Sequence, residues 1–93
     1  MVHVTPELKE IIIREHIESG RTYRSLSNEY GYSASAISGW VGKYRKECQE
    51  NKYKNENLKL MEENLKLKRE LDEAVKETEF LKKAAAFFAR ENN

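Results

Sequence analysis

The residues from Asn57 to Phe88 carry a seven-residue repeat, which constrains the fold more than any other feature of the chain. Its a and d positions alternate by three and four over more than four heptads, a spacing typical of a coiled coil. These positions are occupied by Asn57, Leu60, Asn64, Leu67, Leu71, Ala74, Thr78, Leu81, Ala85 and Phe88. Neither Gly nor Pro occurs between Glu47 and Asn93, so we predict a long, unbroken helix for the repeat.

Charged residues beside the repeat indicate how two such helices pair. In a parallel pair each g residue faces the e residue five positions further along the partner. Glu63 then faces Lys68, and Glu77 faces Lys82, with opposite charges in both cases. The first two a positions are Asn, which gives up stability for register and favours two strands. We therefore predict a homo-oligomer that is a parallel dimeric coiled coil.

A second apolar stripe accompanies the first heptads. It consists of Leu58, Met61 and Leu65, and it is interrupted further on by Lys68 and Asp72. This stripe widens the apolar face at the start of the repeat and could support a higher oligomer. It does not replace the main seam, by which we mean the a and d positions of the repeat.

Capping residues upstream of the repeat predict three short helices. Thr5, Thr22 and Ser33 each stand where an N-cap is expected. Gly20 and Gly31 follow the first two helices and supply the left-handed backbone that commonly ends a helix. The buried stripe of the first helix is predicted to be Leu8, Ile11, Ile12, Ile13 and Ile17.

The second and third of these helices follow the spacing of a helix-turn-helix motif. In a twenty-residue frame that begins at Tyr23, the motif positions 4, 8, 9, 10, 15 and 18 hold Leu26, Tyr30, Gly31, Tyr32, Ile37 and Trp40. Gly makes the turn, and the apolar positions seal two helices at a steep angle. Ser27 stands where Ala is usual, which is a small departure. A generic three-helix unit is the alternative; we predict the DNA-binding motif, with Tyr30 and Trp40 in the core.

In a helix-turn-helix protein the third helix enters the major groove of double-stranded DNA. Its outward residues here include Ser33, Ala34, Ser35, Ser38, Gly39 and Gly42. None of them can make the bidentate base contact that Arg, Asn or Gln makes. Each glycine inside a helix costs about 1 kcal/mol relative to Ala, so two of them indicate a close approach, either to DNA or to the first helix. The predicted DNA-binding residues are Arg21, Thr22, Tyr23, Arg24, Ser33, Ser35, Ser38, Lys43, Arg45 and Lys46.

The charge distribution agrees with nucleic-acid binding. The net charge is only +1, but Lys and Arg exceed Glu by three between Arg21 and Glu47, which is a weak local signal for DNA. Cys48 is the only cysteine, so no internal disulfide can form. No Gly-rich loop, metal-ligand spacing or nucleophile–base pair is recognisable. We therefore predict no catalytic residues, metal, cofactor or small-molecule substrate, no membrane span, and a cytoplasmic protein.

The predicted organisation is all-α, with a three-helix DNA-binding domain at residues 1–50 and a leucine-zipper segment at residues 51–93. The polar, Asn-rich stretch at residues 49–56 joins the two. It is either a short hinge or a continuation of the third helix into the coil, and the sequence leaves both alternatives open.

Four segments resemble the OrfA proteins of two-frame bacterial insertion sequences, the insertion-sequence-three family. They are Gly20–Leu26, Gly31–Ser33, Ile37–Val41 and, most specifically, Glu79–Ala89. The resemblance implies a helix-turn-helix plus leucine-zipper subunit that binds the element's terminal inverted repeats, multimerises and modulates transposition. It also implies that the catalytic DDE domain belongs to a longer, frameshift-fused transposase product. The a and d positions are polar at Asn57, Asn64 and Thr78 and small at Ala74 and Ala85, so exchange between partners should be easy, and we predict mixed oligomers with that longer product. A free-standing helix-turn-helix repressor and a structural coiled-coil adaptor are the competing functions.

Overall fold

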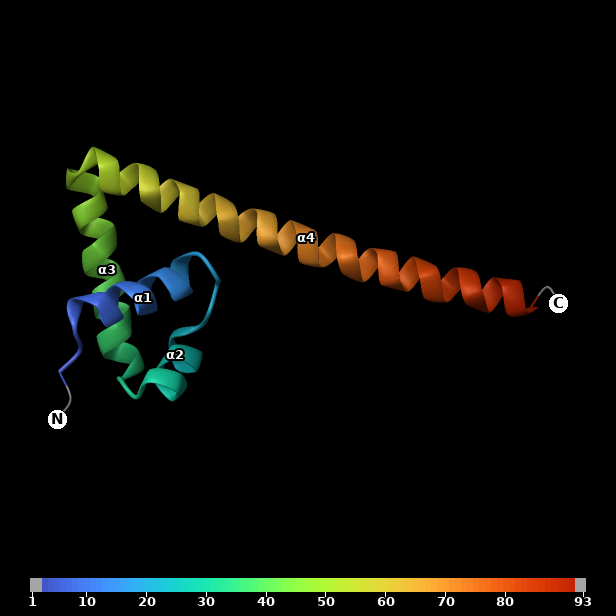
Figure 1. Ribbon diagram of the computed structural model, residues 1–93, viewed down its shortest axis with the longest axis horizontal. Coiled ribbons are helices and arrows are strands. Elements are labelled where there is room, and N and C mark those ends of the chain that lie inside the picture. Colours follow the sequence, from blue (N-terminus) through green and yellow to red (C-terminus); the bar gives the residue numbers. More distant parts are fainter. Residues whose placement is uncertain (1–2, 92–93) are drawn as a thin grey trace.

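The computed structural model describes residues 3–91, and this part of the chain folds into four helices without a strand (Figure 1). The helices are α1 (Pro6–Ile17), α2 (Tyr23–Tyr30), α3 (Ala34–Glu50) and α4 (Lys52–Glu91). The predicted all-α class is confirmed: a three-helix unit is followed by one long helix that extends far beyond it. Residues 1–2 and 92–93, which belong to the predicted segments 1–50 and 51–93, lie outside the described residues.

The predicted capping residues set the ends of the short helices. The side chains of Thr5, Thr22 and Ser33 each accept a hydrogen bond of 3.1 Å from the amide three residues further on. Gly31 caps α2 with a φ of 83°, and Gly20, in the loop after α1, has a φ of 75°. L side chains rarely adopt this left-handed backbone, so both glycines are required where the sequence places them.

The helix-turn-helix pair α2–α3 closes over the first of two core clusters. Ile12, Leu26 and Ile37 come from three different helices and are fully buried. Tyr30 and Trp40 are half-buried and pack against this cluster, as predicted. The three contributing helices are therefore sealed together in the arrangement that the motif spacing predicts.

The predicted burial of Ile11 is wrong, because half of its surface is exposed. The buried arc of α1 runs instead from Leu8 through Ile12 and Ile13 to Ile17. This arc is buried because Ile12 packs with residues of α2 and α3, while Ile13 and Ile17 pack with residues of α3 and α4. Ile11 lies on the opposite side of the helix.

The chain turns a sharp corner at Asn51, which separates α3 from α4 (Figure 1). Asn51 is the one non-helical residue there, with extended backbone angles of −130° and 113°. Its side-chain oxygen accepts a hydrogen bond of 3.1 Å from the amide of Lys54 and so caps the new helix. The connection is therefore neither a hinge of several residues nor a straight continuation, but a capped corner of one residue.

The corner folds the start of α4 back onto the three-helix unit. Leu58 and Met61 are 8% and 7% exposed and complete a second core cluster. The other members of this cluster are Ile13, Ile17, Val41 and Cys48. The stripe that the sequence offered for a higher oligomer is thus covered within the chain at Leu58 and Met61, so that alternative is wrong at these two positions.

Two further contacts join this docked part of α4 to the residues that follow α1. Asn64 donates a hydrogen bond of 3.4 Å to the carboxylate of Glu18 at the end of α1. Leu65 lies over Gly20, where an added Cβ would come within 2.9 Å of its Cδ1 atom. Glycine is therefore required at position 20 for two reasons, its left-handed backbone conformation and the close approach of α4.

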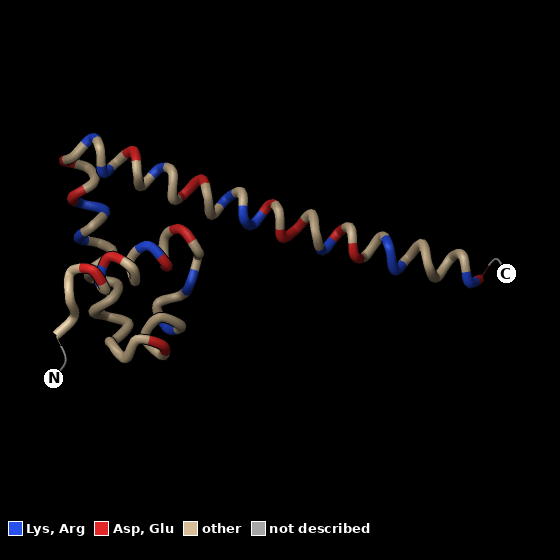
Figure 2. The backbone as a smooth tube through the Cα atoms, viewed as in Figure 1, with Lys and Arg blue, Asp and Glu red and all other residues tan. Residues whose placement is uncertain are grey.

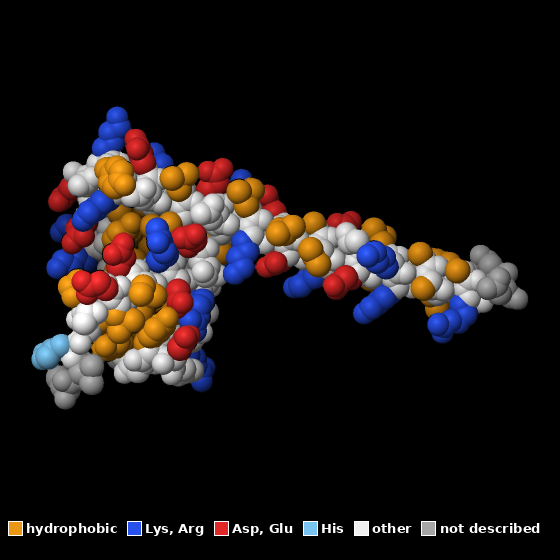
Figure 3. All heavy atoms as spheres, viewed as in Figure 1, with side chains coloured by type: hydrophobic (Ala, Val, Ile, Leu, Met, Phe, Trp, Pro, Cys, Tyr) orange, Lys and Arg blue, Asp and Glu red, His pale blue; other side chains and the backbone are white. Residues whose placement is uncertain are grey.

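Beyond the docked turns α4 is a bare rod, and the molecule measures 65 × 34 × 18 Å. Apolar side chains follow the rod to its end (Figure 3). The seam residues Leu60, Leu67 and Leu71 are 58%, 54% and 63% exposed. At about 100° per residue, Leu60 and Leu67 lie on the side of α4 opposite Leu58. One face of the helix thus packs on its own chain and the other is left uncovered. None of the helices within residues 3–91 has the length and hydropathy needed to span a membrane.

Candidate DNA-binding interface

The outer face of α3 is smooth in its first half. Ser35, Ser38, Gly39 and Gly42 are exposed and recur at helical spacing, opposite the buried residues of the same helix. A Cβ built on Gly39 or Gly42 would meet no atom within 4 Å. The two glycines therefore do not accommodate the first helix, and the alternative of a close approach by DNA stays a prediction. Without protruding side chains, this helix fits a major groove about 12 Å wide.

The second half of α3 carries the positive charge of this face. Figure 2 shows basic residues only in the half of α3 that is nearer to α4. Lys43 and Lys46 are exposed there, and Arg24 is exposed on α2. Within residues 3–91 no ion pair or side-chain hydrogen bond engages these three cations. They are therefore available to phosphate groups, which position a protein on DNA without specifying sequence.

Arg21 has a different environment from the one that the sequence suggested. Its guanidinium pairs with Glu29 and, at 2.7 Å, with Glu15, and it donates a hydrogen bond of 2.8 Å to the hydroxyl of Ser25. The hydrogen bond to Glu29 is the largest cause of a raised Arg21 pKa. Tyr30 donates a further hydrogen bond of 3.1 Å to Glu15. Arg21 thus ties α1 to α2, and its guanidinium is engaged by side chains of the same chain.

Four more of the predicted contact residues also have partners within the chain. Thr22 and Ser33 use their hydroxyls as helix caps. The ring of Tyr23 stacks on His16 with 4.2 Å between centroids. Arg45 pairs with Glu62 of α4 at 3.1 Å. The predicted residues without such a partner in the described chain are Arg24, Ser35, Ser38, Lys43 and Lys46.

One residue of the outer face was missed by the sequence reasoning. Gln49 is exposed and lies three residues beyond Lys46, on the same side of α3 as Gly42. Its amide is of the type that pairs with adenine in the major groove. The available signal is its spacing of three residues from Lys46, but the sequence prediction places residues 49–56 in the connection.

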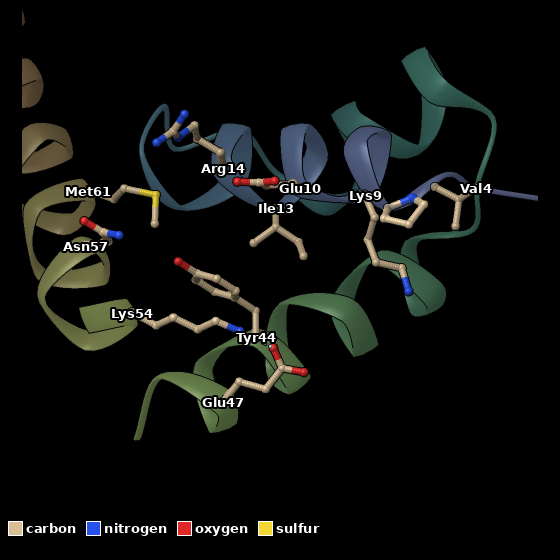
Figure 4. A pocket seen from close by; sticks show the side chains of 11 residues that line it. Val4, Lys9, Glu10, Ile13, Arg14, Tyr44, Glu47, Lys54, Asn57 and Met61 are labelled. Carbon is tan, nitrogen blue, oxygen red and sulfur yellow. Dashed lines mark hydrogen bonds and ion pairs between the residues drawn. The ribbon is translucent and has the colours of Figure 1, made fainter. Parts of the chain in front are cut away.

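A cavity of about 490 Å³ lies on another side of α3, between the start of α1 and the start of α4 (Figure 4). Its walls mix apolar side chains, among them Ile13 and Met61, with charged ones such as Glu10 and Lys54. Burial, together with a hydrogen bond to Cys48, raises the pKa of the Tyr44 hydroxyl in this wall to about 12. The phenol is therefore neutral at physiological pH and cannot act there as a general base. In the described part of the chain no three His, Cys, Asp or Glu side chains are placed to bind a metal ion.

Comparison with known proteins gives one match. A family model described as "Transposase", which represents a helix-turn-helix domain, matches residues 4–72, and these include α1, α2, α3 and the docked part of α4. No curated protein and no solved structure matches the chain. The match covers most of the chain. The matched residues contain the helix-turn-helix pair α2–α3 and the outer face of α3. The chain therefore belongs to the helix-turn-helix transposase family, as a subunit of the OrfA type found in the insertion-sequence-three family.

Proposed function

We propose that this chain is the DNA-binding, non-catalytic subunit of an insertion-sequence transposase and that it binds the element's terminal inverted repeats. The observation that carries this proposal is the outer face of α3. This face has no large side chain at Ser35, Ser38, Gly39 and Gly42, and it is cationic at Lys43 and Lys46. The first part approaches the base edges in the major groove. The second part, with Arg24 from α2, neutralises phosphates on the groove walls. Arg21 and Arg45 hold the helices that present this face.

Two copies of the chain pair in parallel through the exposed seam of α4. The large seam residues Leu60, Leu67, Leu71, Leu81 and Phe88 are each more than half exposed in the single chain, which is the surface that a coiled coil buries. Because the start of α4 packs against α1 and α3, pairing of the coil also fixes the two helix-turn-helix units relative to each other. A symmetric dimer presents two reading helices to two half-sites.

The family membership supports a division of labour between two products. The catalytic DDE domain belongs to a longer transposase product, and this chain joins it in mixed oligomers through the shared seam in the cytoplasm. A free-standing transcriptional repressor is the alternative function. It would protect its own promoter from cleavage without binding the element's ends, so footprinting on both DNA segments separates the two functions.

We expect Arg24→Ala and Lys43→Ala each to weaken binding to all duplexes alike. Each lost phosphate contact should make the slope of log affinity against log salt shallower by about 0.9. Fluorescence anisotropy titrations over a range of salt concentrations measure both effects. Lys76→Ala, which removes an exposed lysine from the distal rod, is the matched control and should change neither quantity. Unchanged affinity of the Arg24 and Lys43 variants at low salt would show that another face binds DNA.

We expect a cysteine at Leu67 to form a disulfide with its own copy under mild oxidation. A parallel, in-register seam brings identical d positions together, within the short reach of a disulfide. Native Cys48 is 1% exposed and does not compete. A cysteine at neighbouring Lys66, outside the seam, serves as the control and should cross-link poorly. If the Leu67 variant links only to a cysteine placed near the other end of the coil, the helices are antiparallel.

A further inference from the structure

The last two heptads of α4 carry more apolar surface than a two-stranded seam can cover. Phe80 and Phe87 are 69% and 60% exposed, and with Ala84 between them they form one stripe at spacings of four and three. In the register of the seam these are c and g positions, whereas a two-stranded coil buries a and d. Both phenylalanines therefore remain in water when two chains pair. The ring of Phe87 contacts that of seam residue Phe88 edge-on, at 6.0 Å between centroids, so the stripe is continuous with the seam.

Apolar side chains lie on two faces of this end of the rod. The seam alternates the small or polar residues Thr78 and Ala85 with the large residues Leu81 and Phe88, while Phe80 and Phe87 lie outside it. Each Phe ring has about 150–250 Å² to bury. The arc from Phe80 to Phe88 is therefore wider than a two-stranded coil covers, and Phe80 and Phe87 can be buried only by a helix outside the dimer.

The wider apolar arc is confined to the end of α4. One heptad earlier, the corresponding c and g positions are Glu73 and Glu77, which do not pack in a bundle core. At the other end of α4, Leu58 and Met61 are covered by the chain's own core. The first heptads therefore keep two strands, and only the last two heptads can join further helices.

We propose that the stripe formed by Phe80, Ala84 and Phe87 is a second interface, through which the end of one dimer packs against the end of another dimer of this chain. The inference rests on the proposed parallel dimer. A second copy offers an identical stripe, and the phenylalanines lie almost symmetrically on either side of Ala84, so two stripes fit across a two-fold axis. The small Ala84 allows the helices to approach closely. This end lies far from the three-helix unit (Figure 1), so the contact leaves α3 uncovered.

Sedimentation equilibrium of the full-length protein over a wide concentration range tests the proposal. Because the two stripes of a parallel dimer face opposite sides, the wild type should pass from dimer to tetramer and then to larger assemblies as its concentration rises. The double variant Phe80→Glu/Phe87→Glu should stay dimeric, with a tetramer dissociation constant at least about 100-fold higher, because two buried aromatic anchors are lost at each copy of the stripe. The milder Phe80→Ala/Phe87→Ala variant should show the same defect while circular dichroism reports an intact helix.

Lys83→Glu is the matched control, because it adds negative charge next to the stripe without removing apolar surface, and it should still form tetramers. A wild type that remains dimeric at every concentration would overturn the second interface and leave the proposed dimer standing. A tetramer that tolerates both phenylalanine substitutions would also overturn it. A monomeric wild type would instead refute the coiled coil on which the proposed function depends.

Discussion

Replacing Leu58 by Ala is expected to lower the free energy of unfolding of the three-helix unit by about 2–5 kcal/mol. Leu58 belongs by sequence to the coiled-coil repeat, yet its side chain is 8% exposed and packs in a core with residues of α1 and α3. The substitution leaves a cavity in that core, which the surrounding helices can close only in part. Denaturant unfolding, followed by near-ultraviolet circular dichroism of Trp40 and the tyrosines packed on the core, measures the loss.

Leu67→Ala is the matched control for this experiment. It makes the same chemical change on the same helix, but Leu67 is 54% exposed and lies outside both core clusters. We expect it to weaken association of the coil and to leave the unfolding signal of the three-helix unit unchanged. Both variants are compared at the same protein concentration, because association that is coupled to folding shifts the measured stability. Equal effects of the two substitutions on that signal would mean that α4 does not pack on the unit.

The helix ends could be predicted from the sequence because their causes are local. Thr5, Thr22 and Ser33 bond to amides three residues away, so a short window contains both partners. The corner at Asn51 could not be predicted in this way, since no Gly or Pro marks it. The turn is stabilised by Leu58 and Met61, which reach a core built by residues at least ten positions earlier. The predicted boundary between residues 50 and 51 coincides with this corner, and we propose that the folding unit nevertheless extends across it.

The candidate site was predictable to a similar extent. The sequence correctly indicated an exposed face on α3, because the motif spacing specifies which residues are buried. It could not separate Arg24 from Arg21. The carboxylate partners of Arg21 lie six residues before it and eight after it, and neither interval matches the three or four residues that join neighbours on one helix. Only the packing of α1 against α2 brings the two glutamates to the same guanidinium.

The double substitution Gly39→Ala/Gly42→Ala is expected to make the protein more stable and a weaker DNA binder. Both glycines lie inside α3, and an added Cβ would meet no atom within 4 Å. Alanine should therefore raise the free energy of unfolding by about 1 kcal/mol at each position, which thermal unfolding measures. If α3 approaches the base edges through this face, two methyl groups hold it away from them. At a typical overpacking cost of about 1–3 kcal/mol, the affinity falls roughly 5- to 150-fold.

Opposite changes in stability and affinity make this pair of measurements informative, because damage to the fold would lower both. Gly20→Ala supplies the contrast: its φ of 75° and the Leu65 Cδ1 atom 2.9 Å from the new Cβ predict lower stability. Ser38→Ala, a neighbour on the same face of α3, removes a hydroxyl without adding bulk and should cost little affinity. If the double glycine variant gains stability and binds DNA as tightly as the wild type, α3 does not approach DNA through Gly39 and Gly42. The absence of bulk on this face would then need another physical reason.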